Sequence, residues 1–212
     1  MKISEIFFSI QGESSYAGLP CIFIRLAGCN LKCEYCDTSY AQDLDEGYEM
    51  TIDEILHEVN KFKCNLVEIT GGEPLMQDET VPLINKLLAL KYKVLLETNG
   101  TISLKGIDKK IIKIMDIKTP GSGFQYSFIK DNLKYIRRDD EIKFVLVDRN
   151  DYEWAKALLK KYSLEGKAKL LFSAAHKRLS LDKLSEWILK DRLNVKLQPQ
   201  LHKIIWGKKR GV

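Results

Sequence analysis

Six short apolar runs, separated by segments with helical periodicity, constrain the fold of this 212-residue chain most strongly. Each run is long enough for one strand, and its continuous apolar character is typical of a parallel sheet that is buried on both faces. Strands that alternate with helices along a chain form right-handed βαβ units. The six predicted strands are Cys21–Leu26, Leu66–Thr70, Lys93–Glu97, Ile112–Ile117, Glu141–Val147 and Ala168–Phe172.

Helices are expected between several of these strands. Thr51 and Glu54 have the spacing of a capping box, and apolar residues at helical spacing follow them as far as Phe62. Further helices are predicted from about Glu79 to Leu90, from Asn150 or Asp151 to about Tyr162, and from Ser180 to about Lys190.

The number of strands decides between the architectures that such units can build. A closed barrel has eight strands and about 250 residues, so this chain is too short for one. We predict an α/β fold with an open, partial parallel β/α barrel of six strands, and a flat doubly wound sheet is the alternative. No repeat or long linker divides the sequence, so one domain over residues 1–212 is expected.

Composition restricts the environment and the partners. The chain has 34 Lys and Arg against 29 Asp and Glu, and a net charge of +5 is too small to indicate direct nucleic-acid binding. The sequence contains no apolar run of about 18 residues, so no membrane helix is predicted, and the first residues do not resemble a signal peptide. An odd number of cysteines, five, argues against a secreted disulfide framework, so we expect a cytoplasmic protein.

Three cysteines lie within eight residues at the spacing C-x3-C-x2-C: Cys29, Cys33 and Cys36. Three thiolates can hold three corners of a [4Fe–4S] cluster, and the missing fourth ligand would leave one iron open to a small molecule. The alternative is a structural zinc site, but that needs four ligands, often in two C-x2-C pairs. Cys21 and Cys64 lie alone in apolar runs and are expected to be small buried hydrophobes.

Polar or glycine-rich segments directly follow five of the six predicted strands. The carboxyl ends of parallel strands meet at one edge of a sheet, where binding sites form. Glu97 and Asn99 have side chains suited to ribose hydroxyls, and glycines allow close approach of the backbone to a ligand. The five segments are the cysteine loop, Thr70–Pro74, Glu97–Gly100, Asp116–Pro120 and Ser173–His176.

The cysteine spacing, followed about 35 residues later by Gly71-Gly72-Glu73-Pro74, resembles the radical S-adenosylmethionine (SAM) superfamily. The resemblance implies that the three cysteines hold a [4Fe–4S] cluster whose open iron chelates SAM. It also implies that Tyr35 lies near the adenine and that Gly72 and Glu73 support the ammonium end of SAM.

A narrower resemblance begins at the N-terminus. Phe7–Glu13, Gly18–Pro20, Phe23–Cys33 and Cys36–Thr38 resemble the 7-carboxy-7-deazaguanine synthase family, and the likeness extends to Asp116–Gly123 and Gln198–Lys203. Ser14 replaces the glycine that is usual after Gln-Gly-Glu. The resemblance implies a lyase that converts 6-carboxy-5,6,7,8-tetrahydropterin to 7-carboxy-7-deazaguanine with loss of ammonia, toward queuosine and archaeosine.

This family resemblance assigns roles to individual residues. It implies that Arg25 and Glu13 are catalytic, that Thr38 binds Mg²⁺, that an electron donor such as flavodoxin reduces the cluster, and that the chain forms a homodimer. The pterin would contact Ile10, Gln11, Gly12, Glu13, Arg25, Thr70 and His202. SAM would contact Tyr35, Cys36, Asp37, Gly72, Glu73, Glu97, Asn99, Lys118, Thr119, Pro120, Ser173, Ala174, Ala175 and His176.

Elementary chemistry supports some of these roles independently. Arg25 lies in an apolar strand, where a charge needs an anionic partner, either a substrate carboxylate or a structural salt bridge. Gln11 and Glu13 offer donors and acceptors that match the amide and amine edge of a pterin. Magnesium usually keeps several waters, so one hydroxyl such as that of Thr38 can be its only protein ligand.

Two other functions share some of these features. An activase that makes a glycyl radical on a protein partner would have the same cysteine loop, but would not need Gln11, Glu13 and Arg25 around a small pocket. A zinc or RNA-binding module would be colourless and would bind RNA in a salt-dependent way. The basic tail Trp206–Val212 is expected to be solvated, although chain-terminal residues in the resembled family are thought to reach the substrate.

Overall fold

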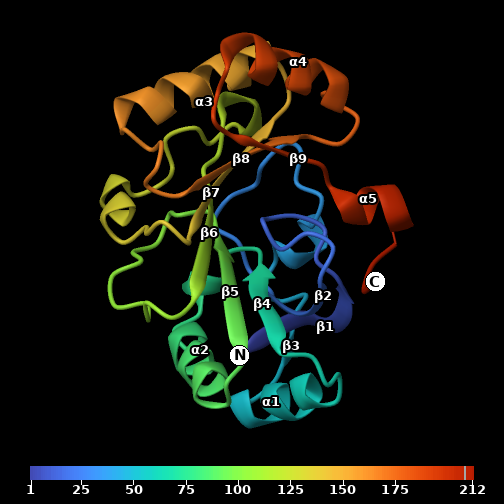
Figure 1. Ribbon diagram of the computed structural model, residues 1–212. Coiled ribbons are helices and arrows are strands. Elements are labelled where there is room, and N and C mark those ends of the chain that lie inside the picture. The colour runs from blue at the N-terminus through green and yellow to red at the C-terminus, as the bar shows by residue number, and fades with distance from the viewer. Residues whose placement is uncertain (208) are drawn as a thin grey trace.

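A computed structural model describes residues 1–207 and 209–212, and the strands in this part of the chain form one nine-stranded sheet. Lys208, in the basic tail, lies outside the described residues. Six central strands are mutually parallel and curve together in Figure 1, which confirms the predicted partial barrel. They are β2 (Pro20–Leu26), β4 (Leu66–Gly71), β5 (Lys93–Thr98), β6 (Ile112–Asp116), β7 (Glu141–Leu146) and β8 (Lys169–Ala174).

Three further strands, which the sequence did not predict, extend the sheet at its two edges. β1 (Lys2–Ile10) pairs antiparallel with β2 and with the two-residue β3 (Tyr48–Glu49), whereas β9 (Lys196–Gln198) is parallel to β8. β1 mixes polar and apolar residues because much of it is only half buried. β3 and β9 are too short to produce a periodic pattern.

Five α-helices accompany the sheet within the described residues. The four longer ones confirm the predictions: α1 (Ile52–Asn60), α2 (Thr80–Ala89), α3 (Arg149–Lys161) and α4 (Leu181–Asp191). The capping box is present, since the Thr51 side chain accepts from the Glu54 amide and the Glu54 side chain accepts from the Thr51 amide. The fifth, α5 (Leu201–Trp206), was not predicted. Four short 3-10 turns are η1 (Ser39–Ala41), η2 (Pro74–Met76), η3 (Pro120–Ser122) and η4 (Lys130–Lys134).

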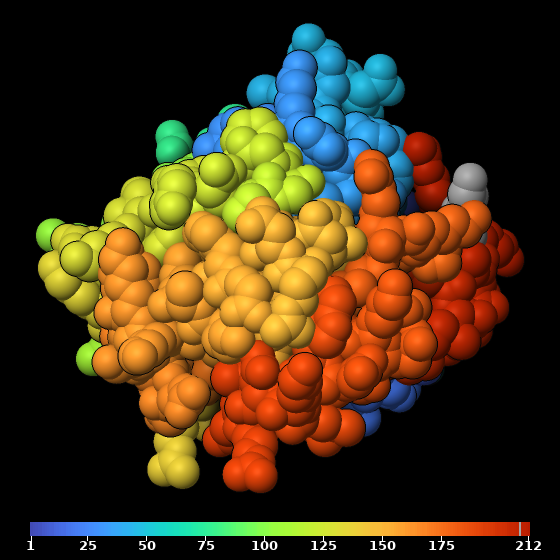
Figure 2. Space-filling model, turned by 90° about the horizontal axis from the view of Figure 1, so that it is seen from above, coloured from blue at the N-terminus to red at the C-terminus, as the bar shows by residue number. Residues whose placement is uncertain are grey.

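The helices cover the outer face of the curved sheet in two groups. α1 and α2 pack on the first strands through Ile55, Val59 and Leu83, and α3 and α4 pack on the later strands through residues such as Leu158 and Leu184. In Figure 2 the amber and orange residues of α3 and α4 fill the centre of the view, and red C-terminal residues lie beside them. The outer face is therefore covered largely by apolar packing.

A smaller apolar cluster closes the inner face at the amino ends of the strands. It includes Cys21, which is fully buried as predicted, while Cys64 packs against it and is only half buried. No helix in the described residues is long and apolar enough to cross a membrane.

Candidate active site

A cavity of about 640 Å³ opens on the inner face of the barrel, above this apolar cluster. Side chains alternate between the two faces of a strand, so residues two apart on one strand face the same side. The inward apolar residues of four strands are followed, two positions further along, by inward polar residues. Phe23, Leu66, Leu95 and Ile114 belong to the apolar floor, and Arg25, Glu68, Glu97 and Asp116 line the cavity above it.

The three cysteines of the loop after β2 all line this cavity, and all three are free thiols. Burial raises the pKa of Cys33 to about 11, and the amide of Leu31 donates to Cys29 Sγ at 3.4 Å. Cys21 and Cys64 do not reach the cavity, so the donor set is three thiols with no fourth cysteine. That set fits a [4Fe–4S] cluster with one open iron, because a bound metal favours the thiolate form.

A closed zinc site needs four ligands, and the cysteine loop supplies three. Among residues 1–207 and 209–212, no group of three or more His, Cys, Asp or Glu side chains is arranged to hold a metal ion.

The glycine-rich segment after β4 packs directly on the cysteine loop. The amides of Gly72 and Glu73 donate to the carbonyls of Leu26 and Gly28 at 3.2 and 2.9 Å. A Cβ added at Gly72 would lie 2.1 Å from the Gly28 carbonyl oxygen and 2.6 Å from Cys29 Cβ. Only glycine therefore permits this close approach.

Glu73 itself faces away from the cavity and is fully buried. Its carboxylate accepts from Thr98 Oγ1 at 2.9 Å, from the Asn99 amide at 2.7 Å and from the Leu75 amide at 3.1 Å. Burial raises the pKa of Glu73 to about 6, although these hydrogen bonds oppose the rise. The geometry makes Glu73 a link between the carboxyl ends of β4 and β5.

The buried ammonium of Lys143 on β7 lies among the polar residues that line the cavity. It donates to Glu13 at 2.8 Å, is ion-paired with Glu97, and lies 3.5 Å from Asp116. Burial opposes the charge on Lys143, but the surrounding carboxylates outweigh it and hold the pKa of Lys143 well above its ordinary value. Burial likewise opposes ionisation of Glu13, yet Lys143 and His202 lower the pKa of Glu13.

Two hydrogen-bonded pairs of polar side chains lie beside Lys143. Gln11 donates a hydrogen bond to Glu68, and Thr70 donates to Glu97 at 3.0 Å. Burial, together with the neighbouring Glu97 carboxylate, raises the pKa of Glu68 well above its ordinary value. The polar lining of the cavity thus combines an ionised carboxylate at Glu13 with a carboxyl group at Glu68 that favours its neutral form.

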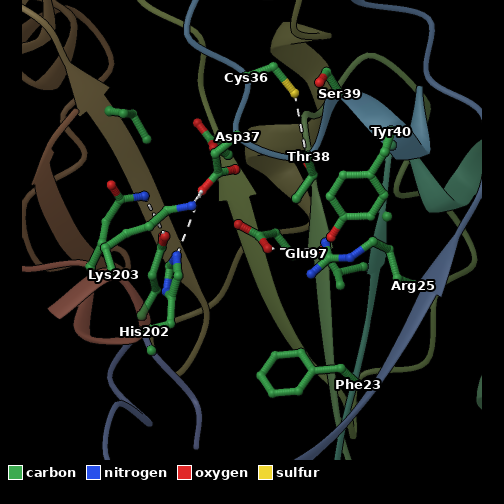
Figure 3. Close-up of a pocket in the computed structure, with 18 of the residues that line it drawn as sticks. Phe23, Arg25, Cys36, Asp37, Thr38, Ser39, Tyr40, Glu97, His202 and Lys203 are labelled. Carbon is green, nitrogen blue, oxygen red and sulfur yellow. Dashed lines mark hydrogen bonds and ion pairs between the residues drawn. The ribbon is translucent and has the colours of Figure 1, made fainter. Parts of the chain in front are cut away.

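Arg25 forms the structural salt bridge that the sequence left open as one of two alternatives. Its Nε donates to Glu5 at 2.8 Å, and the Tyr40 hydroxyl donates to the same carboxylate oxygen at 2.8 Å. The guanidinium nevertheless lines the cavity, and its two terminal nitrogens donate no hydrogen bond within the described part of the chain. Figure 3 shows Arg25 beside Tyr40 and directed toward Glu97.

The C-terminal segment closes one side of the cavity. Lys203 Nζ lies 3.0 Å from Asp37 Oδ2 and His202 Nε2 lies 3.7 Å from it, and Figure 3 shows both side chains directed at that carboxylate. Burial opposes ionisation of Asp37, but the adjacent His202 and Lys203 side chains outweigh it and lower the pKa of Asp37. Gln200 donates to Glu13 at 2.9 Å.

The residues beyond α5 also reach the rim of the cavity. Arg210 lies 3.6 Å above the Tyr40 ring, and residues 209–212 line the rim while remaining largely exposed to solvent. The basic tail is therefore in contact with the site as well as with solvent.

Most residues that the sequence singled out share this cavity. Five do not line it: Glu73, Thr119, Pro120, Ser173 and Ala174. Thr119 donates to Asp151 at 2.8 Å and Ser173 to the Gln198 carbonyl at 3.0 Å, so both hold neighbouring segments in place. The cavity is lined by Ile10, Gln11, Gly12, Glu13, Arg25, Cys29, Cys33, Tyr35, Cys36, Asp37, Thr38, Thr70, Gly72, Glu97, Asn99, Lys118, Ala175, His176 and His202.

Sequence reasoning missed several polar residues of the site, namely Glu5, Tyr40, Glu68, Lys143 and Lys203. Glu68 and Lys143 carried a usable signal, because each is a charged residue inside an apolar strand and needs a partner there. No such signal marks Glu5, Tyr40 and Lys203, because their neighbours in sequence are a mixture of polar and apolar residues.

Comparison with known proteins gives a consistent result. The sequence model of the Radical SAM superfamily matches residues 23–146. The 7-carboxy-7-deazaguanine synthase of Koribacter versatilis is 45% identical over 97% of both chains. That of Chlorobaculum tepidum is 44% identical over 98% of this chain and 94% of its own, and that of Thermoplasma acidophilum is 38% identical over 100% of both. Among solved structures, QueE from Escherichia coli has the same fold, with a TM-score of 0.78 and 24% identity over 95% of this chain and 94% of that chain.

Proposed function

Because the chain belongs to the radical SAM superfamily, and within it to the 7-carboxy-7-deazaguanine synthase family, we propose that it converts 6-carboxy-5,6,7,8-tetrahydropterin to 7-carboxy-7-deazaguanine with loss of ammonia. Membership in the superfamily implies a [4Fe–4S] cluster and SAM. The observation that carries the substrate assignment is that one cavity is lined both by the three cysteines and by Arg25, Gln11 and Glu13.

Cys29, Cys33 and Cys36 would hold the cluster, and the bound cluster and SAM would supply hydrogen-atom chemistry that protein side chains lack. The chain offers SAM the backbone of Gly72 and the acceptor oxygens of Glu97 and Asp116. Asp116 Oδ1 is buried without a hydrogen-bond partner in the described residues, and a ligand hydroxyl or ammonium would satisfy it.

The substrate groups have matching partners in the same cavity. The terminal nitrogens of Arg25 suit a carboxylate, because Glu5 occupies only Nε and fixes the plane of the guanidinium. Gln11 and the ionised Glu13 suit the amide and amine edge of the pterin. α5 covers one side of the cavity, where Lys203 is paired with Asp37, and this cover would limit the access of water to a reactive intermediate.

We assign Mg²⁺ to the hydroxyl of Thr38, which lines the cavity. No group of acidic side chains in the described residues forms a cage for the ion, so the remaining ligands would be waters and substrate oxygens. Removal of Mg²⁺ with EDTA, followed by addition of graded amounts, should lower and then restore the rate. A Thr38→Val variant should lose this dependence.

Two macromolecular partners belong to the proposal. The cluster requires an electron donor such as flavodoxin. A homodimer is supported by the outer edge of β1, where Phe8 is 43% exposed and stacks on Phe62. Light scattering would measure the dimer, and a Phe8→Lys variant should shift it toward monomer.

The test of the whole proposal is direct. The protein is purified without oxygen, loaded with iron and sulfide, and given SAM, dithionite, Mg²⁺ and the pterin, and the product is identified by mass spectrometry. We expect 7-carboxy-7-deazaguanine from the wild type, none from Cys33→Ala, and normal yield from Cys64→Ala, whose thiol lies outside the cavity. SAM cleavage without deazaguanine would contradict the substrate assignment and leave the superfamily membership intact.

A further inference from the structure

Lys143 joins the two halves of the cavity, and no motif in the sequence assigns it a role. Glu13, which accepts a hydrogen bond from Gln200, belongs to the side proposed for the pterin, whereas Glu97 and Asp116 belong to the side proposed for SAM. The Lys143 side chain is only 5% exposed, yet it lies at the boundary of the cavity between these two sides.

The protein already engages the Lys143 ammonium, through two hydrogen bonds and a third, longer ion-pair contact. An ammonium group has three N–H donors, and three carboxylates surround this one: Glu13 at 2.8 Å, Glu97 in an ion pair, and Asp116 at 3.5 Å. Lys143 is therefore committed mainly to these carboxylates, and it acts on a ligand chiefly through them.

Those carboxylates keep acceptor capacity for ligands. Each carboxylate oxygen has two lone pairs; Lys143 occupies one on Glu13 Oε2, and Gln200 occupies one on Oε1. Glu97 receives Thr70 on its second oxygen. Both groups are thus fixed in orientation while oxygen lone pairs remain available.

We propose that Lys143 is a positioning residue that keeps Glu13 ionised and oriented toward the pterin and Glu97 oriented toward SAM. This inference rests on the proposed function. Without the ammonium, Asp116 would keep Lys118 at 3.0 Å, but Glu13 and Glu97 would lose the cation they share, and neighbouring carboxylates without a cation retain protons. A protonated Glu13 would lose its acceptor character toward the amine edge of the substrate.

The consequence for pH dependence has a definite sign. Removing the positive charge raises the pKa of Glu13, so the acidic limb of kcat/KM moves to higher pH, by about one unit or more. The charged and titratable groups that face Glu13 and Lys143 are Arg25 from β2, Glu68 from β4, Glu97 from β5, Asp116 with Lys118 from the end of β6, Asp37 from the cysteine loop and His202 from α5.

Lys143→Met, Lys143→Arg and a matched control test the proposal. The control is Lys113→Met, because Lys113 is also a buried strand lysine, 2% exposed and 2.9 Å from Asp140, but lies outside the cavity. The measurements are the KM and kcat for the pterin across pH, and the dissociation constant of 6-carboxypterin, an oxidised analogue that does not turn over. Thermal unfolding reports the stability of each variant.

We expect Lys143→Met to weaken 6-carboxypterin binding and raise KM by about 10- to 100-fold near neutral pH, with partial recovery at higher pH. Lys143→Arg should restore binding and the wild-type pH limb, and Lys113→Met should lose stability without altering either. Unchanged binding and pH limb in a folded Lys143→Met protein would overturn the role of Lys143. A wild type that neither binds nor converts the pterin would instead refute the proposed function and this role together.

Discussion

Gly72→Ala should separate the cysteine loop from the carboxyl end of β4. The new Cβ would lie 2.1 Å from the Gly28 carbonyl oxygen, and real Cβ contacts do not fall below 3.0 Å, so the loop must retreat by about 0.9 Å. The obstacle is backbone rather than a flexible side chain, so repacking cannot absorb the displacement. Overpacking of this kind costs about 1–3 kcal/mol of folding free energy.

The functional loss should exceed the loss of stability. A displacement of about 1 Å in an active site can reduce the rate about 100-fold, and Cys29 follows directly after Gly28 in the displaced loop. Iron and sulfide content, SAM cleavage and product yield of the reconstituted variant would be measured beside its thermal unfolding.

A second glycine provides the control for this prediction. Gly106 has φ of +86° and no atom within 4 Å of an added Cβ. Gly106→Ala should therefore cost about 1–2 kcal/mol from backbone strain alone and leave cluster content and SAM cleavage normal. If Gly72→Ala also kept wild-type cluster content and rate, the close approach of the two segments would not matter for the site.

Three other changes have defined outcomes. Arg25→Lys cannot hold Glu5 and a substrate carboxylate with the same geometry, so steady-state kinetics should show KM for the pterin raised about tenfold or more. The pKa of Glu73 is about 6, above the ordinary 4.5, because the fold favours the protonated side chain. The stability that Glu73 contributes is therefore complete below pH 4.5 and is lost as the pH rises through 6. Between pH 4.5 and 7, the free energy of unfolding of Glu73→Gln, measured with denaturant, should therefore rise by about 2 kcal/mol relative to that of the wild type. Thr51→Ala removes the cap that Glu54 shares and should lower stability by about 1 kcal/mol in the same assay, with no effect on turnover.

The central strands could be predicted because their burial is visible in the sequence. In β5, Val94, Leu95 and Leu96 are all fully buried with no polar residue among them, as expected of a parallel strand covered on both faces. The first strand gave no such signal, because Ser4 and Glu5 face solvent or the cavity while Ile3 alone of its first residues is fully buried. Edge position, which the sequence does not encode locally, decided that difference.

The site was predictable where its residues are neighbours in sequence. The three cysteines and Gly72 belong to compact motifs whose spacing specifies their chemistry. A motif places a residue at a strand end but does not state which way its side chain points. Adjacent residues of an extended segment face opposite sides, and so Gly72 lines the cavity while Glu73 next to it is buried behind it.

Charged residues inside apolar strands mark buried polar contacts more generally than the motifs do. Arg25, Glu68 and Lys143 interrupt three different strands, and all three line the cavity. Lys113 shows the limit of the rule, since it also interrupts a strand but pairs with Asp140 outside the cavity. The strand period resolves the difference: Ile114 faces the inner cluster, so its neighbour Lys113 faces outward. A strand charge therefore predicts a partner, and both its register and its depth along the strand decide where that partner lies: Glu141, two residues before Lys143 on the same face of β7, pairs with Ser15 outside the cavity.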